Sequence, residues 1–566
     1  MSATAALGRL ETLVHAYGGS VAERKRAALA RLRSTRLARA GEVARLHECL
    51  CFLRAYPDDR ATLELVERML AGFARRADLR RDRERLAGTG IAGTPIEFRF
   101  YWRMARWIVE RWPQRLRIDW EAFDRAERLG EVLGLLAAYA ETPAFDEHTR
   151  SPRAWLRRMC GPRETDAACL VRLCEGIDAA DPWRERLFED LDTPFRLEAG
   201  PDTPTRTLAR FAPSRVELRS APFARTRPDL RLELTRAPSV RPVGLAAGRR
   251  IVDLAREALV TRARDLDVFA NADPRDVRLA DCGSGLELAC IGVLPERRLL
   301  LEAVYGFLML QNGVPIGYSL ASALFGSSEI AFNVFDTFRG AEAGHVFGRV
   351  LATARHLFGS NAFCIDPFQL GHENAEGLAS GAWWFYYKLG FRPRDERVRR
   401  LVRAELRRLR ANPRHRSSAA TLRRLVVAEM YWYAGRPRAD VLGRLSPGAV
   451  GDRVTALLAR IAGGDRRAAL RVCARAAQRR LGVGTLGRLE RGQRIAWERF
   501  GPLVALLPDV ERWSARERRE LVRVILAKGG RRESEFVRRF DRHARLRAAV
   551  RAWGQRRAAE APATAS

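Results

Sequence analysis

The segment Glu329-Ile-Ala-Phe-Asn-Val-Phe-Asp-Thr-Phe-Arg-Gly-Ala-Glu-Ala-Gly344 decides the fold prediction for this chain. Its first seven residues, 329–335, form an apolar run typical of a buried strand, and 336–343 form a loop rich in small residues. A helix is predicted from about Gly344, because apolar residues recur at helical spacing up to Phe358. A strand, a loop and a helix N-terminus in this order present free backbone N–H groups and the positive end of a helix dipole, which together predict an anion site.

Further strands and helices are predicted on both sides of this segment. Asn312-Gly313, between two apolar runs, is the strongest hairpin signal in the chain, since a type I′ turn needs positive φ at both central positions. Apolar runs bounded by turn residues are typical of strands, and apolar residues at a spacing near 3.6 are typical of helices. In chain order, the expected elements are a helix at about 248–264, strands at 286–293, 303–311, 314–324 and 361–367, and a helix at 374–388.

This order of elements resembles the core of the GNAT (N-acetyltransferase-like) superfamily. Val314-Pro-Ile-Gly-Tyr318 resembles the third-strand segment of that family, and residues 339–344 align with its coenzyme A loop, R/Q-x-x-G-x-G/A. Tyr386-Tyr-Lys-Leu-Gly-Phe391 matches its last motif, Y-x-K-x-G-F. The resemblance covers about 295–395 and implies an α+β fold, in which a central mixed β-sheet has helices on both faces.

The resemblance also implies roles for individual residues. Strand 329–335 would splay from the next strand and hydrogen-bond the pantetheine arm of an acyl-CoA donor, while Tyr386 would act as general acid and Glu329 as general base. No metal is implied. The alternatives are a core position for Tyr386 and a surface position for Glu329. The residues expected to hold the donor around its pyrophosphate are Phe335, Arg339, Gly340, Ala341, Glu342, Ala343 and Gly344.

One residue of the loop departs from the family pattern, because Glu342 stands where the first glycine is expected. Glycine lets the backbone approach a pyrophosphate closely, whereas a carboxylate adds negative charge at a phosphate site. Two outcomes are open at this point. Either the Glu342 side chain points away and coenzyme A binds, or the domain has lost or changed its donor.

The rest of the chain divides by composition. Apolar spacing near 3.6 predicts an N-terminal all-α domain over 1–195, and seven prolines mark 196–245 as a linker with short strands such as Leu230–Leu234. The GNAT-like domain is expected over 246–395. Arginine-rich helices follow over 396–558, and a small polar tail at 559–566 is expected to be disordered.

Charge is concentrated toward the C-terminal end. The chain holds 98 arginines and three lysines and carries a formal net charge of +33. Residues 392–566 hold 44 basic and 17 acidic side chains, a net charge of +27. This region is either a set of solvated helix faces or a binding surface for nucleic acid or another polyanion. No apolar run is long enough for a membrane span, and the nine scattered cysteines favour a reducing, cytoplasmic setting without a metal site.

Two classes of function follow. The first is an acyltransferase that uses an acyl-CoA donor and an amine-type acceptor, with a variant that takes an aminoacyl group from tRNA. The second is a non-catalytic GNAT-like module in a scaffold that binds nucleic acid or protein. Retained binding of coenzyme A favours the first class, and binding to nucleic acid that weakens steeply with salt favours the tRNA variant or the second.

Overall fold

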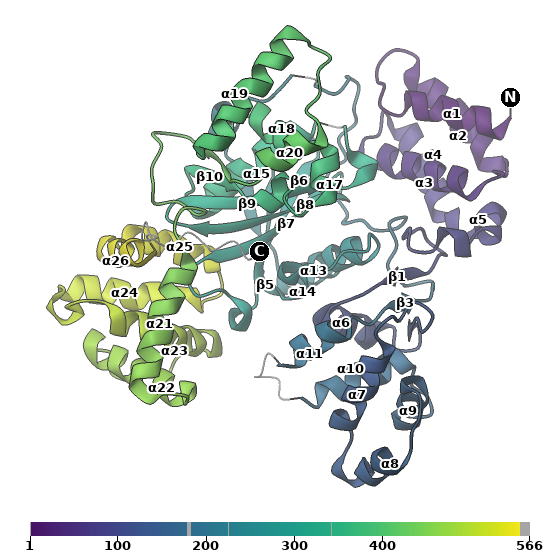
Figure 1. The fold of residues 1–566 in the computed structure, drawn as a ribbon. Coiled ribbons are helices and arrows are strands. Elements are labelled where there is room, and N and C mark those ends of the chain that lie inside the picture. The colour runs from purple at the N-terminus through teal and green to yellow at the C-terminus, as the bar shows by residue number, and fades with distance from the viewer. Residues whose placement is uncertain (1, 178–182, 225, 341, 555–566) are drawn as a thin grey trace.

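The computed structural model describes residues 2–177, 183–224, 226–340 and 342–554 of a mixed α/β protein. A large sheet lies at its centre, with strand order β11-β12-β10-β9-β8-β7-β6-β5-β4 (Figure 1). The strands are β4 (Ser239–Pro242), β5 (Ala272–Asp281), β6 (Leu286–Val293), β7 (Ala303–Gln311), β8 (Val314–Leu324), β9 (Ser327–Val334), β10 (Ala362–Ile365), β11 (Arg392–Pro393) and β12 (Met430–Tyr433).

The sheet opens between β9 and β10. These two strands run parallel, whereas the other neighbouring strands run antiparallel. They pair only from Ser327, opposite Ala362, to Glu329, opposite Cys364. Beyond Glu329, β9 remains paired with β8 as far as Val334, and no strand of the described residues lies on its other side. The outward backbone groups of β9 between Glu329 and Val334 therefore have no strand partner in the described chain.

Helices cover both faces of the sheet, as successive residues of β7 show. The Tyr305 ring lies 5.3 Å from that of Phe358 in α15 (Ala343–Phe358), and the next residue, Gly306, faces Phe269 in α14 (Asp267–Ala270). Because neighbouring side chains of a strand point to opposite faces, α15 and α14 lie on opposite sides of the sheet. Helix α13 (Leu245–Val260) packs against β5.

The predicted hairpin at Asn312-Gly313 is confirmed. Both residues have positive φ, 49° and 78°, and they join β7 to β8. The Asn312 side chain is buried; its Nδ2 donates to the Ala55 carbonyl at 2.9 Å, and its Oδ1 accepts the Glu217 N–H at 2.8 Å. The tip of the hairpin thus fixes two distant segments of the chain against the sheet.

The region predicted as an all-α domain over 1–195 contains two hydrophobic cores and a small sheet. Its first helices share their core with the central sheet. A second core is formed by three short strands and the helices between them; the strands are β1 (Ile96–Phe98), β2 (Leu116–Ile118) and β3 (Phe195–Leu197). The prediction missed these strands because each spans three residues, too few to show a period of two. The first group comprises α1 (Ala3–Leu13), α2 (Val21–Ser34), α3 (Ala40–Ala55), α4 (Arg60–Ala71) and α5 (Ala77–Arg81). The second, the 96–197 module, adds α6 (Trp102–Arg111), α7 (Ala126–Leu136), α8 (Thr142–Glu147), α9 (Pro152–Met159), α10 (Asp166–Glu175) and α11 (Trp183–Leu191).

Three local predictions were wrong. The strand expected at Leu230–Leu234 is a helix, α12 (Leu230–Thr235), which Asp229 caps by accepting the Arg231 N–H at 2.8 Å. The helix expected at 374–388 is broken into α17 (Ala375–Ser380) and α18 (Ala382–Lys388), because Gly381 takes a left-handed conformation with φ of 68°. The region after 395 is not wholly helical, since β12 lies inside the central sheet between β10 and β11.

The helices after residue 446 lie together at lower left in Figure 1, whereas those between residues 396 and 425 lie in its upper part. Their core is continuous with that of the sheet, so the arginine-rich region is not a separate appendage. Within the described ranges, no helix has both the length and the apolarity needed to cross a bilayer. The expected tail at 559–566 lies outside the described residues. The helices are α19 (Glu396–Ala411), α20 (Ala419–Leu425), α21 (Pro447–Ala462), α22 (Arg466–Leu481), α23 (Arg491–Leu506), α24 (Ala515–Lys528), α25 (Glu533–Arg542) and α26 (Ala544–Gly554).

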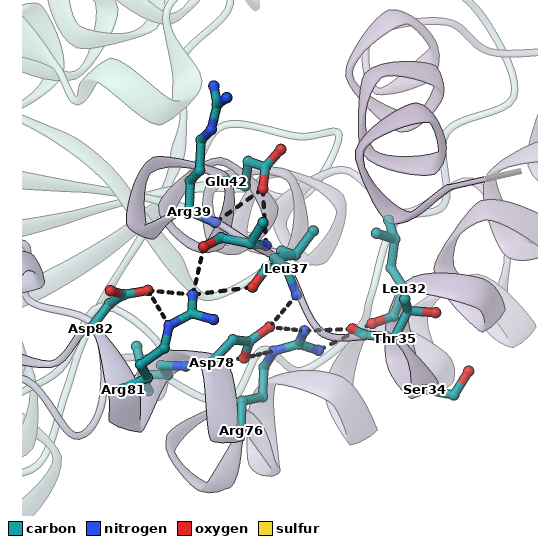
Figure 2. A network of polar contacts seen from close by, with 12 residues as sticks. Leu32, Ser34, Thr35, Leu37, Arg39, Glu42, Arg76, Asp78, Arg81 and Asp82 are labelled. Atoms are coloured by element: carbon teal, nitrogen blue, oxygen red, sulfur yellow. Dashed lines mark hydrogen bonds and ion pairs between the residues drawn. The ribbon is translucent and has the colours of Figure 1, made fainter.

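A buried carboxylate, Asp78, joins α5 to the turn between α2 and α3 (Figure 2). It accepts the Leu37 N–H at 2.9 Å and is paired with Arg76 at 2.6 Å. Arg76 in turn donates to the carbonyls of Leu32 and Thr35. Burial opposes ionisation of Asp78, but the hydrogen bonds from Arg76 and from the Leu37 amide outweigh it and hold the pKa below its usual value.

We expect Asp78→Asn to lower the free energy of unfolding of the N-terminal helices by about 1–3 kcal/mol at pH 7, because it removes the charged acceptor of half-buried Arg76 and of the buried Leu37 amide. A carboxyl whose pKa is depressed in the folded state stabilises it above the unfolded pKa, and this contribution is lost as pH falls through the folded pKa. The difference between variant and wild type should therefore shrink in acid. Hydrogen exchange of the α2–α5 amides at pH 7 and in acid measures it, with exposed Glu84→Gln as control; equal effects at both sites would contradict the prediction.

Candidate functional site

A cavity of about 630 Å³ lies where β9 separates from β10. Its walls come from β8, the end of β9, the loop after β9, the α16–α18 segment and the loop after α13. Phe98 of the 96–197 module also lines it, so that module forms part of the site. The polar residues of the lining are Arg264, Asp265, Tyr318, Asn333, Arg339, Gln369, Asn374, Glu376, Ser380 and Tyr386.

A second cavity of about 450 Å³ lies on the other side of the loop. It shares Gly340, Ala343 and Phe385 with the first, and is further lined by Gly344 and His345 at the start of α15. Lys388 and Arg227 add positive charge to its wall. The first N–H groups of a helix have no acceptor within the helix, so this cavity offers backbone donors together with cationic side chains.

The carboxylate of Glu342 is held by a segment far away in the sequence. It pairs with Arg219 at 2.8 Å and accepts the Ala224 N–H at 3.0 Å. Its backbone has φ of 37°, the left-handed region that the glycine of the family pattern would favour. The charge of Glu342 is therefore paired with the 219–224 segment rather than left free at the loop, and the residue borders the second cavity.

Arg339 fixes the end of β9 to α17. Its guanidinium pairs with Glu376 and, at 2.7 Å, with Asp336, and its Nε donates to the Val334 carbonyl at 3.3 Å. Phe335 is buried beneath the Arg262 guanidinium, which lies 3.8 Å from the ring centroid, and its side chain lines neither cavity. Gly340, Glu342, Ala343 and Gly344 all border the second cavity, whereas Ala341 lies outside the described residues.

Tyr386 lies in the wall of the first cavity, within an aromatic cluster. Its ring contacts those of Phe347, Phe385 and Phe391, and only 2% of the residue is exposed. Its hydroxyl has no hydrogen-bond partner among the described residues, and burial raises the pKa of the phenol above its usual value. The position therefore combines the two alternatives from the sequence: the ring belongs to the core, and the residue borders the cavity.

Glu329 does not lie with Tyr386 in the lining of the cavity. Glu329 shares a face of β9 with Ala331 and Asn333, which do line the cavity. It stands two residues before Ala331, where β9 is still paired with β10 opposite Cys364. Burial and the nearby carboxylates of Asp366, Glu302 and Glu429 raise the pKa of Glu329 to about 7.

Asp265, in the loop after α13, lines the first cavity although no sequence pattern marks it as a site residue. One oxygen of its carboxylate, Oδ2, accepts the Tyr101 N–H at 2.9 Å, and the other is buried without a hydrogen-bond partner in the described chain. Burial raises the pKa of Asp265 to about 7. Nothing in the sequence marks this aspartate, because it stands in a charged helix end and reaches the cavity only through the fold.

The two arginines of the cavity are both committed to one carboxylate. Arg264 pairs with Glu376 at 3.0 Å and reaches the Tyr318 hydroxyl at 3.4 Å, and Arg339 pairs with Glu376 from the other side. No group of His, Cys, Asp and Glu residues in the described ranges has an arrangement that could hold a metal ion. In comparisons with known proteins, no family model, curated protein or solved structure matches the chain.

Proposed function

We propose that this chain is an acyltransferase that moves an acyl group from acyl-coenzyme A, or a related thioester, to an amine. The observation that carries the proposal is the opening of the sheet at Glu329, which leaves one side of β9 unpaired beside a cavity. In the GNAT superfamily, which the sequence resembles over about 295–395, such an opening receives the pantetheine arm of the donor.

The two cavities suit the two ends of such a donor. The amides at the start of α15, with Lys388 and Arg227 nearby, would bind the pyrophosphate. The unpaired backbone of β9 would hydrogen-bond the amides of the arm, and the thioester would then lie in the first cavity near Tyr386. There the Tyr386 hydroxyl would protonate the departing thiolate, because a phenol held neutral by burial remains a proton donor at pH 7.

Isothermal titration with acetyl-coenzyme A tests the proposal. We expect the wild type to bind with a micromolar Kd and Ala343→Asp to weaken binding at least about tenfold, or about 1.4 kcal/mol. The new carboxylate would repel a pyrophosphate at the first turn of α15, where it stabilises the helix itself and should not impair folding.

The matched control is Ala343→Asn, which adds the same bulk without charge and should bind nearly as well as the wild type. Glu342→Gly separates the remaining outcomes. If the wild type does not bind and this variant does, the site is degenerate in this protein; if neither binds, the donor proposal is wrong.

A second candidate function rests on α19 and α20, where exposed arginines exceed their acidic partners. In α19, Glu396 pairs with Arg399 and Arg403, and buried Glu405 pairs with Arg408. The exposed arginines of this segment for which no ion pair is formed within the described chain are Arg397, Arg400, Arg407, Arg410, Arg414, Arg416, Arg423 and Arg424. We propose that this surface binds a polyanion such as nucleic acid, either in a transferase that uses aminoacyl-tRNA or in a non-catalytic scaffold.

A further inference from the structure

The part of the first cavity's wall that comes from the loop after α13 carries a carboxylate oxygen with no hydrogen bond to the described residues. Asp265 is held there by the Tyr101 N–H through its Oδ2 alone, while its Oδ1 is buried and unpaired. A buried polar atom without a partner costs about 1–3 kcal/mol, so a retained one calls for a ligand that completes it.

The charge around the cavity shows what kind of ligand this is. Its two cations, Arg264 and Arg339, are both bound to Glu376, and Asp265 forms no ion pair with any described residue. An anionic group would meet no uncommitted cation in this cavity and would face Asp265. A group that carries positive charge and N–H donors would satisfy the free oxygen.

We propose that Asp265 binds the ammonium group of the acceptor and takes its proton, so that the acceptor is a primary amine held between the sheet and the 96–197 module. This inference rests on the proposed acyl transfer and identifies its base and its acceptor class. The 96–197 module contributes Phe98 to the wall and the Tyr101 N–H to the carboxylate, which gives this otherwise separate core a part in acceptor binding.

Asp265 accepts one proton from the ammonium, and the nitrogen lone pair attacks the thioester carbonyl carbon to form a C–N bond. The C–S bond then breaks, the sulfur leaves as a thiolate, and Tyr386 gives it a proton. The amide nitrogen loses its second proton, which restores the Tyr386 hydroxyl, and Asp265 releases its proton to water. The products are an amide, a free thiol and one proton.

The surroundings of Asp265 set the direction of its pH dependence. Burial is the largest influence on its pKa; Asp267 raises it further, while the Tyr101 and Leu266 amides and Arg256 lower it. The Tyr101 phenol and the Arg264–Glu376 pair are the other ionisable groups near it. With a pKa of about 7, Asp265 is protonated and unable to accept a proton in mild acid, so the rate should rise with pH through this value.

The test uses the full chain, acetyl-coenzyme A and three primary amines, namely lysine, spermidine and a lysine-containing peptide, with release of free thiol as readout. We expect Asp265→Asn to lower kcat/KM for the amine by about 10²–10⁴-fold and to abolish the rise with pH. The Kd for acetyl-coenzyme A should not change. The amide retains the acceptor for the Tyr101 N–H, so the fold is preserved. The control is Asp267→Asn, which removes an exposed carboxylate at the start of α14; since Asp267 raises the pKa of Asp265, this variant should keep the rise of the rate with pH and move it to lower pH.

Glu329→Gln provides the decisive comparison. If this variant abolishes the pH dependence and Asp265→Asn does not, the base is Glu329 and the inference is overturned. If the wild type fails to bind acetyl-coenzyme A, the proposed function fails, and Asp265 is then tested by the thermal shift that the same amines produce. Binding lost in Asp265→Asn would keep the acceptor site; the absence of any Asp265-dependent binding or turnover would overturn it.

Discussion

Glu533→Ala is expected to destabilise the protein by about 3–5 kcal/mol, because it leaves a buried ammonium group without its counter-charge. Lys528, at the end of α24, is 4% exposed, and its Nζ lies 2.6 Å from the Glu533 carboxylate at the start of α25. The same Nζ donates to the Glu302 carbonyl at 2.7 Å, just before β7. Arg298, also buried, lies 3.9 Å from Glu533.

Urea unfolding measures the loss, and hydrogen exchange locates it, since α24 and α25 should lose protection before β7 does. The matched control is the double variant Lys528→Met, Glu533→Gln, which removes both charges and should recover part of the stability. A loss below about 1 kcal/mol in the single variant would show that water or a rearranged Arg298 compensates the ammonium, contrary to this prediction.

Nucleic-acid binding is expected to weaken about 10³–10⁵-fold between 50 and 200 mM salt if the unpaired arginines of the α19–α20 surface each contact a phosphate. The four-residue reversal to glutamate at Arg397, Arg400, Arg407 and Arg410 should remove most of the affinity at low salt. At 100° per residue, Arg400 and Arg407 lie opposite the buried stripe of α19, and the other two lie on its flanks; all four are exposed, so reversal should leave packing intact.

The matched control reverses four exposed arginines of α22, namely Arg466, Arg467, Arg471 and Arg475, and changes the net charge by the same amount. Fluorescence anisotropy with a labelled RNA hairpin and a DNA duplex of equal length compares the variants. Equal weakening by both sets would assign the effect to net charge and contradict a surface on α19. Salt-independent binding would contradict the polyanion proposal as a whole.

The sequence predicted the centre of the sheet well because its strands are buried, continuous apolar runs bounded by turn signals. The observed bounds of β6, β7 and β8 equal the predicted ones. β5 (Ala272–Asp281) was missed, since Asp273, Arg275, Asp276 and Arg278 interrupt its apolar pattern. Asp276 is nevertheless buried, where the Tyr305 hydroxyl donates to it and Arg278 lies 3.7 Å away. The position of β5 in the sheet is therefore determined by its pairing with β4 and β6, which leaves no periodic pattern in the sequence.

Only the part of the candidate site whose residues are contiguous in the sequence could be predicted. The loop after β9 and the helix that follows it are contiguous in sequence, so an anion site there could be expected. The partner of Glu342 is Arg219 and the partner of Asp265 is Tyr101, each more than a hundred residues away. Contacts between residues so far apart leave no periodic signal in the sequence, and one arginine among 98 cannot be recognised as the partner of a given carboxylate. The role of the 96–197 module in the wall of the cavity therefore emerged only from the fold.

The position of β12 has a consequence for synthesis of the protein. β10 ends at Ile365, and its neighbour β12 begins at Met430, so a growing chain carries β10 with one edge uncovered until about 65 further residues have emerged. An uncovered strand edge invites pairing with other chains, and here it would persist for several seconds at about 5–20 residues per second. A chain that ends at residue 395 lacks β12 and would make that exposure permanent, so such a chain should aggregate rather than yield an isolated 246–395 domain.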